Sequence, residues 1–214
     1  MSRSSRVILA VAALLLGAVY ILPLWRIDLV APQYPEGLGL RILVDGIVGR
    51  SPNDLNSINN LNHYIGMQRI EPDAIPELRY MPWIVAGLIV LGLAAAASGR
   101  RAVLYAWLAA LLVAAAAGLV DFWYWGYDYG HNLDPSAAIK VPGMSYQPPV
   151  IGPKTLLNFR AESWPDLGGL IAIAVVSAAA AVAFVEFRRA RRRSRGAPVE
   201  PRLARRRGTR ELVA

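Results

Sequence analysis

The sequence predicts an all-α membrane protein with four transmembrane helices, both termini in the cytoplasm, and two long outer loops that form a small mixed α/β or irregular cap. Two observations support this fold class. Of the 214 residues, 55% are hydrophobic and only 18% are charged, a composition unlike that of an ordinary soluble domain. The apolar residues also gather in four long runs, each close to the roughly 20 residues that a helix needs to cross a bilayer.

The four apolar runs are expected to be helices. Long runs of alanine, leucine and valine are helical rather than alternating, and a helix satisfies all of its backbone hydrogen-bonding groups in lipid. Residues 1–24 hold the N-terminus and the first span, residues 83–120 hold the second and third spans with a short turn at 99–101, and residues 167–187 hold the fourth span. The second span is the shortest, and a buried core helix is the competing interpretation for it.

The distribution of charge predicts the orientation of these spans. The termini, the 99–101 turn and the end of the last span carry fifteen basic and three acidic residues, whereas the two long loops carry eight basic and twelve acidic residues. Because basic residues stay on the cytoplasmic side, both termini are expected inside and both loops outside. The net charge of +8 is therefore a topology signal, and we expect no nucleic-acid partner. The composition suits the bacterial inner (cytoplasmic) membrane.

The first span has a second interpretation. Arg3 and Arg6, followed by the apolar residues 7–16, resemble a secretory signal peptide. No small-x-small cleavage site clearly closes this run, which continues into Tyr20. An uncleaved anchor is therefore the favoured interpretation, and cleavage would leave three spans.

The first outer loop, residues 25–82, is expected to contain strands and a helix. Alternating apolar residues around a Pro/Gly turn predict two short strands. These residues carry the alternation: Ile27, Leu29, Leu38, Leu40, Ile42 and Val44. Ser51 as N-cap and Gly66 as stop predict an amphipathic helix at about 52–65. Its polar stripe contains Asn56, Asn59 or Asn60, His63 and Met67. Three prolines are expected to interrupt the chain before the second span: Pro72, Pro76 and Pro82.

The second outer loop, residues 121–166, begins with an aromatic-rich stretch that is expected to form part of an aromatic belt at the membrane surface. The charges within this stretch indicate that the third helix rises above the membrane. Residues 141–149 are rich in proline and are expected to be irregular and extended. Residues 188–214 are expected to be a basic, disordered cytoplasmic tail against anionic headgroups.

The candidate metal ligands are His63, Met67, His131 and Met144. Thioether sulfur suits Cu(I) and imidazole suits Cu(II), and the chain has no cysteine for a thiolate site. His63 and Met67 are four residues apart and share one helix face, and the second loop brings the other two residues into the same compartment. The competing interpretation is structural, with histidine and asparagine bonding the other loop and methionine filling gaps. No nucleophile elbow or phosphate-binding loop is recognisable, so we do not expect an enzyme.

Four stretches of the loops carry a resemblance to known proteins: WRIDLVAPQYPEGL, INNLNHYIGM, YDYGHNLDP and PGMSYQPP. With these residues the chain resembles a group of bacterial four-helix membrane proteins found near genes for copper-enzyme maturation, notably that of nitrous oxide reductase. The resemblance covers about residues 23–166 and does not include the basic tail. It implies an accessory role near a copper enzyme, and it transfers no ligand set to this chain.

The sequence therefore predicts a non-catalytic membrane accessory protein that assists periplasmic copper delivery or assembly of a copper-dependent respiratory enzyme. Copper is the cofactor considered, and the expected partners are membrane lipids and a periplasmic or membrane protein. The alternative function is a structural or docking subunit of a membrane respiratory complex, without a metal site of its own. A third is an outward-facing enzyme or small-solute transporter, which is disfavoured because the central parts of the spans contain no ionisable residue.

Overall fold

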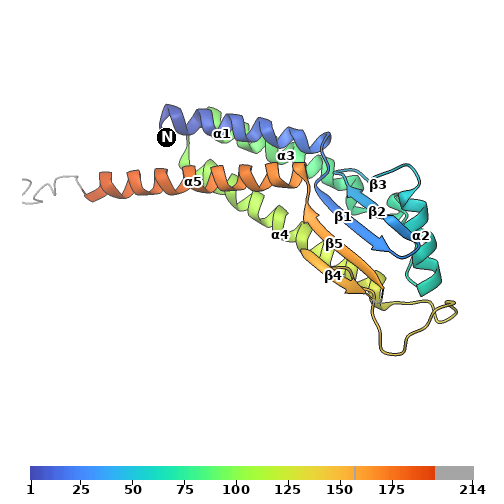
Figure 1. Cartoon of the computed structure of the whole chain (residues 1–214). Coiled ribbons are helices and arrows are strands. Elements are labelled where there is room, and N and C mark those ends of the chain that lie inside the picture. The colour runs from blue at the N-terminus through green and yellow to red at the C-terminus, as the bar shows by residue number, and fades with distance from the viewer. Residues whose placement is uncertain (157, 196–214) are drawn as a thin grey trace, which may run out of the picture.

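The computed structural model describes residues 1–156 and 158–195, with four long helices side by side at one end and a small sheet at the other (Figure 1). All four helices are long and apolar enough to cross a membrane, as the sequence predicted. They are α1 (Arg3–Leu15, followed by the 3-10 turn Leu16–Tyr20), α3 (Glu77–Ser98), α4 (Arg101–His131) and α5 (Leu167–Arg195). Met1 and the last turns of α5 share one end of this bundle, here called the terminal end, and the opposite end is called the sheet end.

Small residues let the four helices pack closely. Helix α1 packs against α3 and α5, and α4 packs against the same two helices from the other side. The indole of Trp107 on α4 is fully buried in the bundle and donates a hydrogen bond to the Leu88 carbonyl on α3 at 2.8 Å. A Cβ on Gly92 would lie 2.6 Å from this indole and 2.8 Å from Ala13 on α1. Glycine at position 92 therefore permits three helices to meet, as small residues commonly do between membrane helices.

A buried carboxylate joins the helices at the terminal end. Glu186 on α5 is only 1% exposed, and it accepts hydrogen bonds from the Ser2 amide at 3.0 Å and the Ser5 hydroxyl at 2.8 Å. It also pairs with Arg101 at 3.3 Å and with Arg189 at 3.1 Å. A buried carboxylate is stable only when its charge is paired and hydrogen-bonded, and Glu186 meets that condition. It thereby ties the first residues of the chain to the start of α4, where Arg101 lies, and to the last third of α5.

Two helix boundaries differ from the sequence prediction. Helix α3 begins at Glu77, so Pro82 lies inside the helix and does not interrupt the chain before it. Pro82 lacks an amide hydrogen but is only the sixth residue of α3, so one intrahelical bond is lost near the helix start. Helix α5 continues to Arg195, so the first part of the expected tail is helical, and residues 196–214 lie outside the described residues. Helix α4 continues to His131, as the charges after residue 120 indicated.

The two long connections between the helices build one antiparallel sheet. The first connection contributes β1 (Trp25–Ala31), β2 (Tyr34–Ile42) and β3 (Ile47–Gly49), and the second contributes β4 (Gly152–Leu156) and β5 (Phe159–Pro165). The strand order is β3-β2-β1-β5-β4. The predicted hairpin of β1 and β2 is confirmed, and its central strand β1 also pairs with β5 from Trp25↔Pro165 to Val30↔Arg160. The expected cap is therefore a mixed α/β unit made by both loops.

Helix α2 (Asp54–Ile65) packs on the apolar face of this sheet, where Ile58 contacts Leu38 and Leu40. The N-cap residue is Asn53 instead of the predicted Ser51, because Asp54 turns inward and accepts a hydrogen bond from the Gly39 amide on β2 at 2.8 Å. The predicted stop at Gly66 is confirmed.

Part of the polar stripe of α2 is structural. Asn59 is buried and makes two hydrogen bonds with the Ile70 backbone, at 2.8 and 3.1 Å. Asn62 is also buried and donates to the Gln68 carbonyl at 3.2 Å. These bonds hold the segment that leads through the 3-10 turn Pro72–Ala74 into α3. The asparagines thus bond residues that follow in the same loop, which leaves His63 and Met67 for other contacts.

Candidate functional site

The two long connections meet at the C-terminal end of α2. The Gly66 carbonyl accepts a hydrogen bond from the Asp134 amide at 2.8 Å, and the Tyr64 carbonyl accepts one from the Ile139 amide at 2.9 Å. Gly66 has a φ of 81°, a left-handed conformation that glycine adopts without steric cost. A Cβ on Gly66 would lie 2.9 Å from the Asp134 carbonyl oxygen. This contact, called here the α2 junction, therefore depends on a glycine.

The segment that crosses the α2 junction is also fixed to α4. The Tyr146 amide donates to the Gly130 carbonyl at 2.9 Å, and a Cβ on Gly130 would overlap the backbone of Gln147. Residues 132–145 therefore leave the end of α4, cross the end of α2 and return to α4. They contain no helix or strand, as the sequence predicted for residues 141–149.

The two methionines of the expected ligand set lie at the α2 junction. Met67 follows Gly66, and Met144 lies two residues before the contact with α4. Both are half-buried and pack against one hydrophobic cluster, which consists of Ala31, Ile65, Tyr146 and Phe159. The structure thus places one methionine from each long connection against the same cluster.

His63 lies at the exposed rim of the same junction. Its ring is 6.2 Å from that of Tyr64, and its charge acts on the carboxylate of Asp134. Hydrogen bonds from the hydroxyl and amide of Ser136, with a smaller contribution from His63, hold the pKa of Asp134 below its ordinary value of 3.8.

His131 is held by its own helix. It is exposed at the end of α4 and stacks on Tyr127, with ring centroids 4.0 Å apart and an interplanar angle of 18°. Its Nδ1 lies 2.9 Å from the Tyr127 carbonyl oxygen, so its Nε2 is the ring nitrogen left for another partner. Tyr127 in turn stacks on Trp123 at 5.5 Å. The sequence singled out His131 as a ligand but did not show this aromatic stack.

The expected ligands therefore do not share one arrangement. Two thioethers lie at a common cluster, His63 lies at its rim, and His131 belongs to an aromatic stack on α4. Within the described part of the chain, no three histidine or carboxylate side chains gather closely enough to hold a metal ion by themselves. A copper ion at the α2 junction would therefore depend on sulfur ligands together with the His63 imidazole, and this donor set suits Cu(I).

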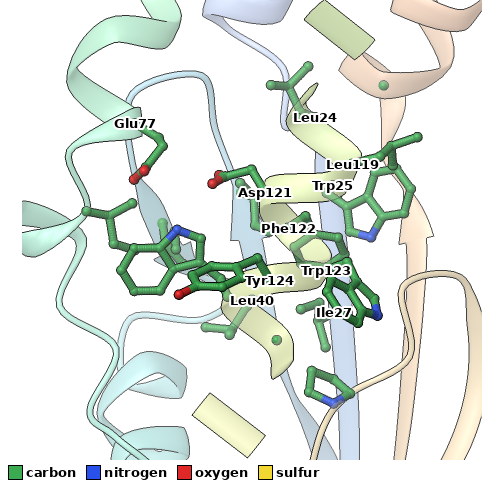
Figure 2. Close-up of a pocket in the computed structure, with 18 of the residues that line it drawn as sticks. Leu24, Trp25, Ile27, Leu40, Glu77, Leu119, Asp121, Phe122, Trp123 and Tyr124 are labelled. Carbon is green, nitrogen blue, oxygen red and sulfur yellow. The ribbon is translucent and has the colours of Figure 1, made fainter. Parts of the chain in front are cut away.

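A large apolar chamber lies beside the α2 junction, between the sheet and the sheet ends of α3 and α4. Its volume is about 1130 Å³, slightly above the roughly 300–1,000 Å³ of small-molecule sites. Figure 2 shows Trp25 and Ile27 of β1 on one wall and Phe122 of α4 among the lining side chains. Two carboxylates also line it, Glu77 and Asp121. No local sequence pattern indicates this chamber, because its walls come from segments far apart in the chain.

Comparison with known proteins gives no match to a family profile, and no curated protein matches the chain.

Proposed function

We propose that the chain is a non-catalytic accessory protein of the bacterial inner membrane that assists copper delivery, or assembly of a copper-dependent respiratory enzyme, at the outer face. Both termini lie in the cytoplasm in this proposal, because the terminal end carries the excess of basic residues. The sheet, α2 and the α2 junction then lie in the periplasm. No turnover is proposed.

One observation carries this proposal: Met67 and Met144, from different loops, pack against the same cluster while His63 lies at its rim. Thioether sulfur and imidazole are ligands that retain Cu(I) in a compartment without free thiolates. Half-buried sulfur atoms near the protein surface also suit transfer of the ion to a partner. The resemblance of the loops to proteins near copper-enzyme maturation genes points in the same direction.

Titration with Cu(I) against a competing chelator tests the proposal on detergent-purified protein. We expect His63→Ala and Met67→Leu each to weaken binding by about tenfold or more, which corresponds to about 1.4 kcal/mol or more. Met81→Leu is the matched control, because Met81 packs in the helix bundle. His131→Ala tests whether the residue on the α4 stack takes part. Unchanged affinity in both Met67→Leu and the His63→Ala/His131→Ala double variant would remove the metal site.

A structural or docking subunit of a respiratory complex is the second candidate function, favoured by the face of the sheet opposite α2. This face exposes Trp164 (38%), Val30 (49%) and Val48 (44%) among charged side chains. Exposed tryptophan is common at protein interfaces. Under this function a partner should co-purify equally from copper-depleted and copper-supplied cells, and Trp164→Ser should release it. Under the copper proposal, association with the partner should depend on the supply of copper.

A further inference from the structure

The apolar chamber continues the membrane-facing surface of the helices. Its walls include Tyr80 and Ile84 of α3 and Val120 and Tyr124 of α4, all of which are more than half exposed on the outside of the bundle. Trp83 on α3, 78% exposed, lies at the same level as this opening. Tryptophan and tyrosine mark the membrane–water interface. A hydrocarbon chain can therefore pass from the bilayer between α3 and α4 into the chamber without leaving an apolar surface.

The two carboxylates in the chamber have no cation within the described part of the chain. Glu77 and Asp121 face each other in Figure 2 and repel each other electrostatically. Among the described residues neither makes an ion pair, and the Glu77 Oε2 atom is buried without a hydrogen-bond partner. Two adjacent carboxylates in an apolar site are costly unless a proton or a cation lies between them. A proton or a positively charged group between the two carboxylates would relieve this cost.

The carboxylates also lie at the depth of lipid headgroups. Glu77 precedes Trp83 by six residues, about 9 Å of helix, on the side away from the membrane centre. Asp121 directly follows the last residue of the expected third span and precedes Trp123 of the aromatic belt. The apolar part of the chamber extends from here beneath the sheet.

We propose that the chamber binds a membrane aminolipid, with a hydrocarbon tail against the apolar walls and the primary ammonium of its headgroup between Glu77 and Asp121. An ammonium offers three hydrogen-bond donors and one positive charge, which pairs with both carboxylates. A lipid with a purely anionic headgroup would add a third negative charge and is disfavoured at this position. The aromatic rings at the opening add cation–π attraction for an ammonium. This inference does not depend on the copper proposal, because the two carboxylates that hold the ammonium are not copper ligands, although Met67 also lines the chamber.

The test uses the full chain in nanodiscs that contain phosphatidylethanolamine and phosphatidylglycerol in equal amounts, with EDTA to remove divalent cations. Native mass spectrometry then counts the lipids that the released protein retains. We expect retained phosphatidylethanolamine to exceed phosphatidylglycerol by about tenfold, the ratio that one charge-assisted hydrogen bond provides. In Glu77→Gln/Asp121→Asn this ratio should fall towards one while lipid is still retained. Glu71→Gln, at an exposed carboxylate outside the chamber, is the charge control.

A second pair of variants tests occupation of the chamber itself. A Cβ on Gly118 meets no atom within 4 Å, and Gly118 lines the chamber, so Gly118→Leu should occupy part of the chamber and lower the number of retained lipids. Gly87→Leu is the matched control, because Gly87 is equally open but does not line the chamber. Three results would overturn the proposal: a wild-type protein that retains no lipid, equal retention of both lipids, or a ratio that the carboxylate variants leave unchanged.

Discussion

Replacement of Gly66 by alanine tests how the two loops are held together. The φ of 81° is unfavourable for alanine by about 1–2 kcal/mol. The new Cβ would also lie 2.9 Å from the Asp134 carbonyl oxygen and 3.0 Å from the Ala137 Cβ. Separation of these groups would weaken the two junction hydrogen bonds, from Asp134 and Ile139, each worth about 0.5–1.5 kcal/mol. Loss of both bonds in addition to the backbone cost gives an expected local destabilisation of about 2–5 kcal/mol.

Hydrogen exchange measured by mass spectrometry on peptides from residues 132–146 reports this change. At a factor of ten for each 1.4 kcal/mol, the junction amides should exchange roughly 30- to 4000-fold faster in Gly66→Ala. Gly143→Ala is the matched control, because Gly143 has a φ of 74° but no atom within 4 Å of a Cβ. It should show only the backbone cost of about 1–2 kcal/mol. Equal effects of the two variants, or unchanged exchange in Gly66→Ala, would refute the reasoning.

Two further predictions concern single carboxylates. Glu186→Gln removes the negative charge that pairs with Arg101 and Arg189, and it should lower the unfolding free energy by about 1–3 kcal/mol. The thermal midpoint in detergent should fall accordingly. An unchanged midpoint would show that these ion pairs do not stabilise the protein. Because the pKa of Asp134 is lowered on folding, its bonds to Ser136 contribute stability above pH 3.8 that is lost as the pH falls through the lower folded pKa. Ser136→Ala should move this pKa up towards 3.8 in a carboxyl NMR titration, and an unmoved pKa would contradict the assignment.

The helices and the first hairpin follow from local patterns. Long apolar runs predict the four spans because the bilayer imposes a minimum length on them. The alternation of Ile27, Leu29, Leu38 and Leu40 predicts β1 and β2, because one face of this hairpin is covered by α2. The start of α2 was misplaced by two residues, because Asp54 bonds the Gly39 amide, a contact that no local pattern shows.

Strands β4 and β5 were not predicted, and the reason is physical. The inward residues of β5 include Ala161 and Ser163, which are small or polar and give little hydrophobic alternation. Ala161 and Ser163 pair with Leu29 and Ile27 of β1, which lie more than a hundred residues earlier in the chain. The same limit applies to the functional sites. The sequence indicated the candidate residues at the α2 junction by their chemical type. It did not indicate that Glu77 and Asp121 lie close together, because this depends on the packing of α3 beside α4 at the sheet end.

The pairing of β1 with β5 in an oxidising compartment is the central claim, and one disulfide in intact cells tests it most directly. The chain has no cysteine, so Val30→Cys/Arg160→Cys introduces the only two thiols. Positions 30 and 160 are register partners on adjacent strands, within reach of a disulfide. After denaturation the two thiols should not react with a maleimide–polyethylene glycol reagent unless the disulfide is first reduced. In the control Val30→Cys/Ala161→Cys the two cysteines lie on opposite faces of the sheet, so both thiols should react without reduction. Two free thiols in the Val30→Cys/Arg160→Cys protein from intact cells would contradict the account.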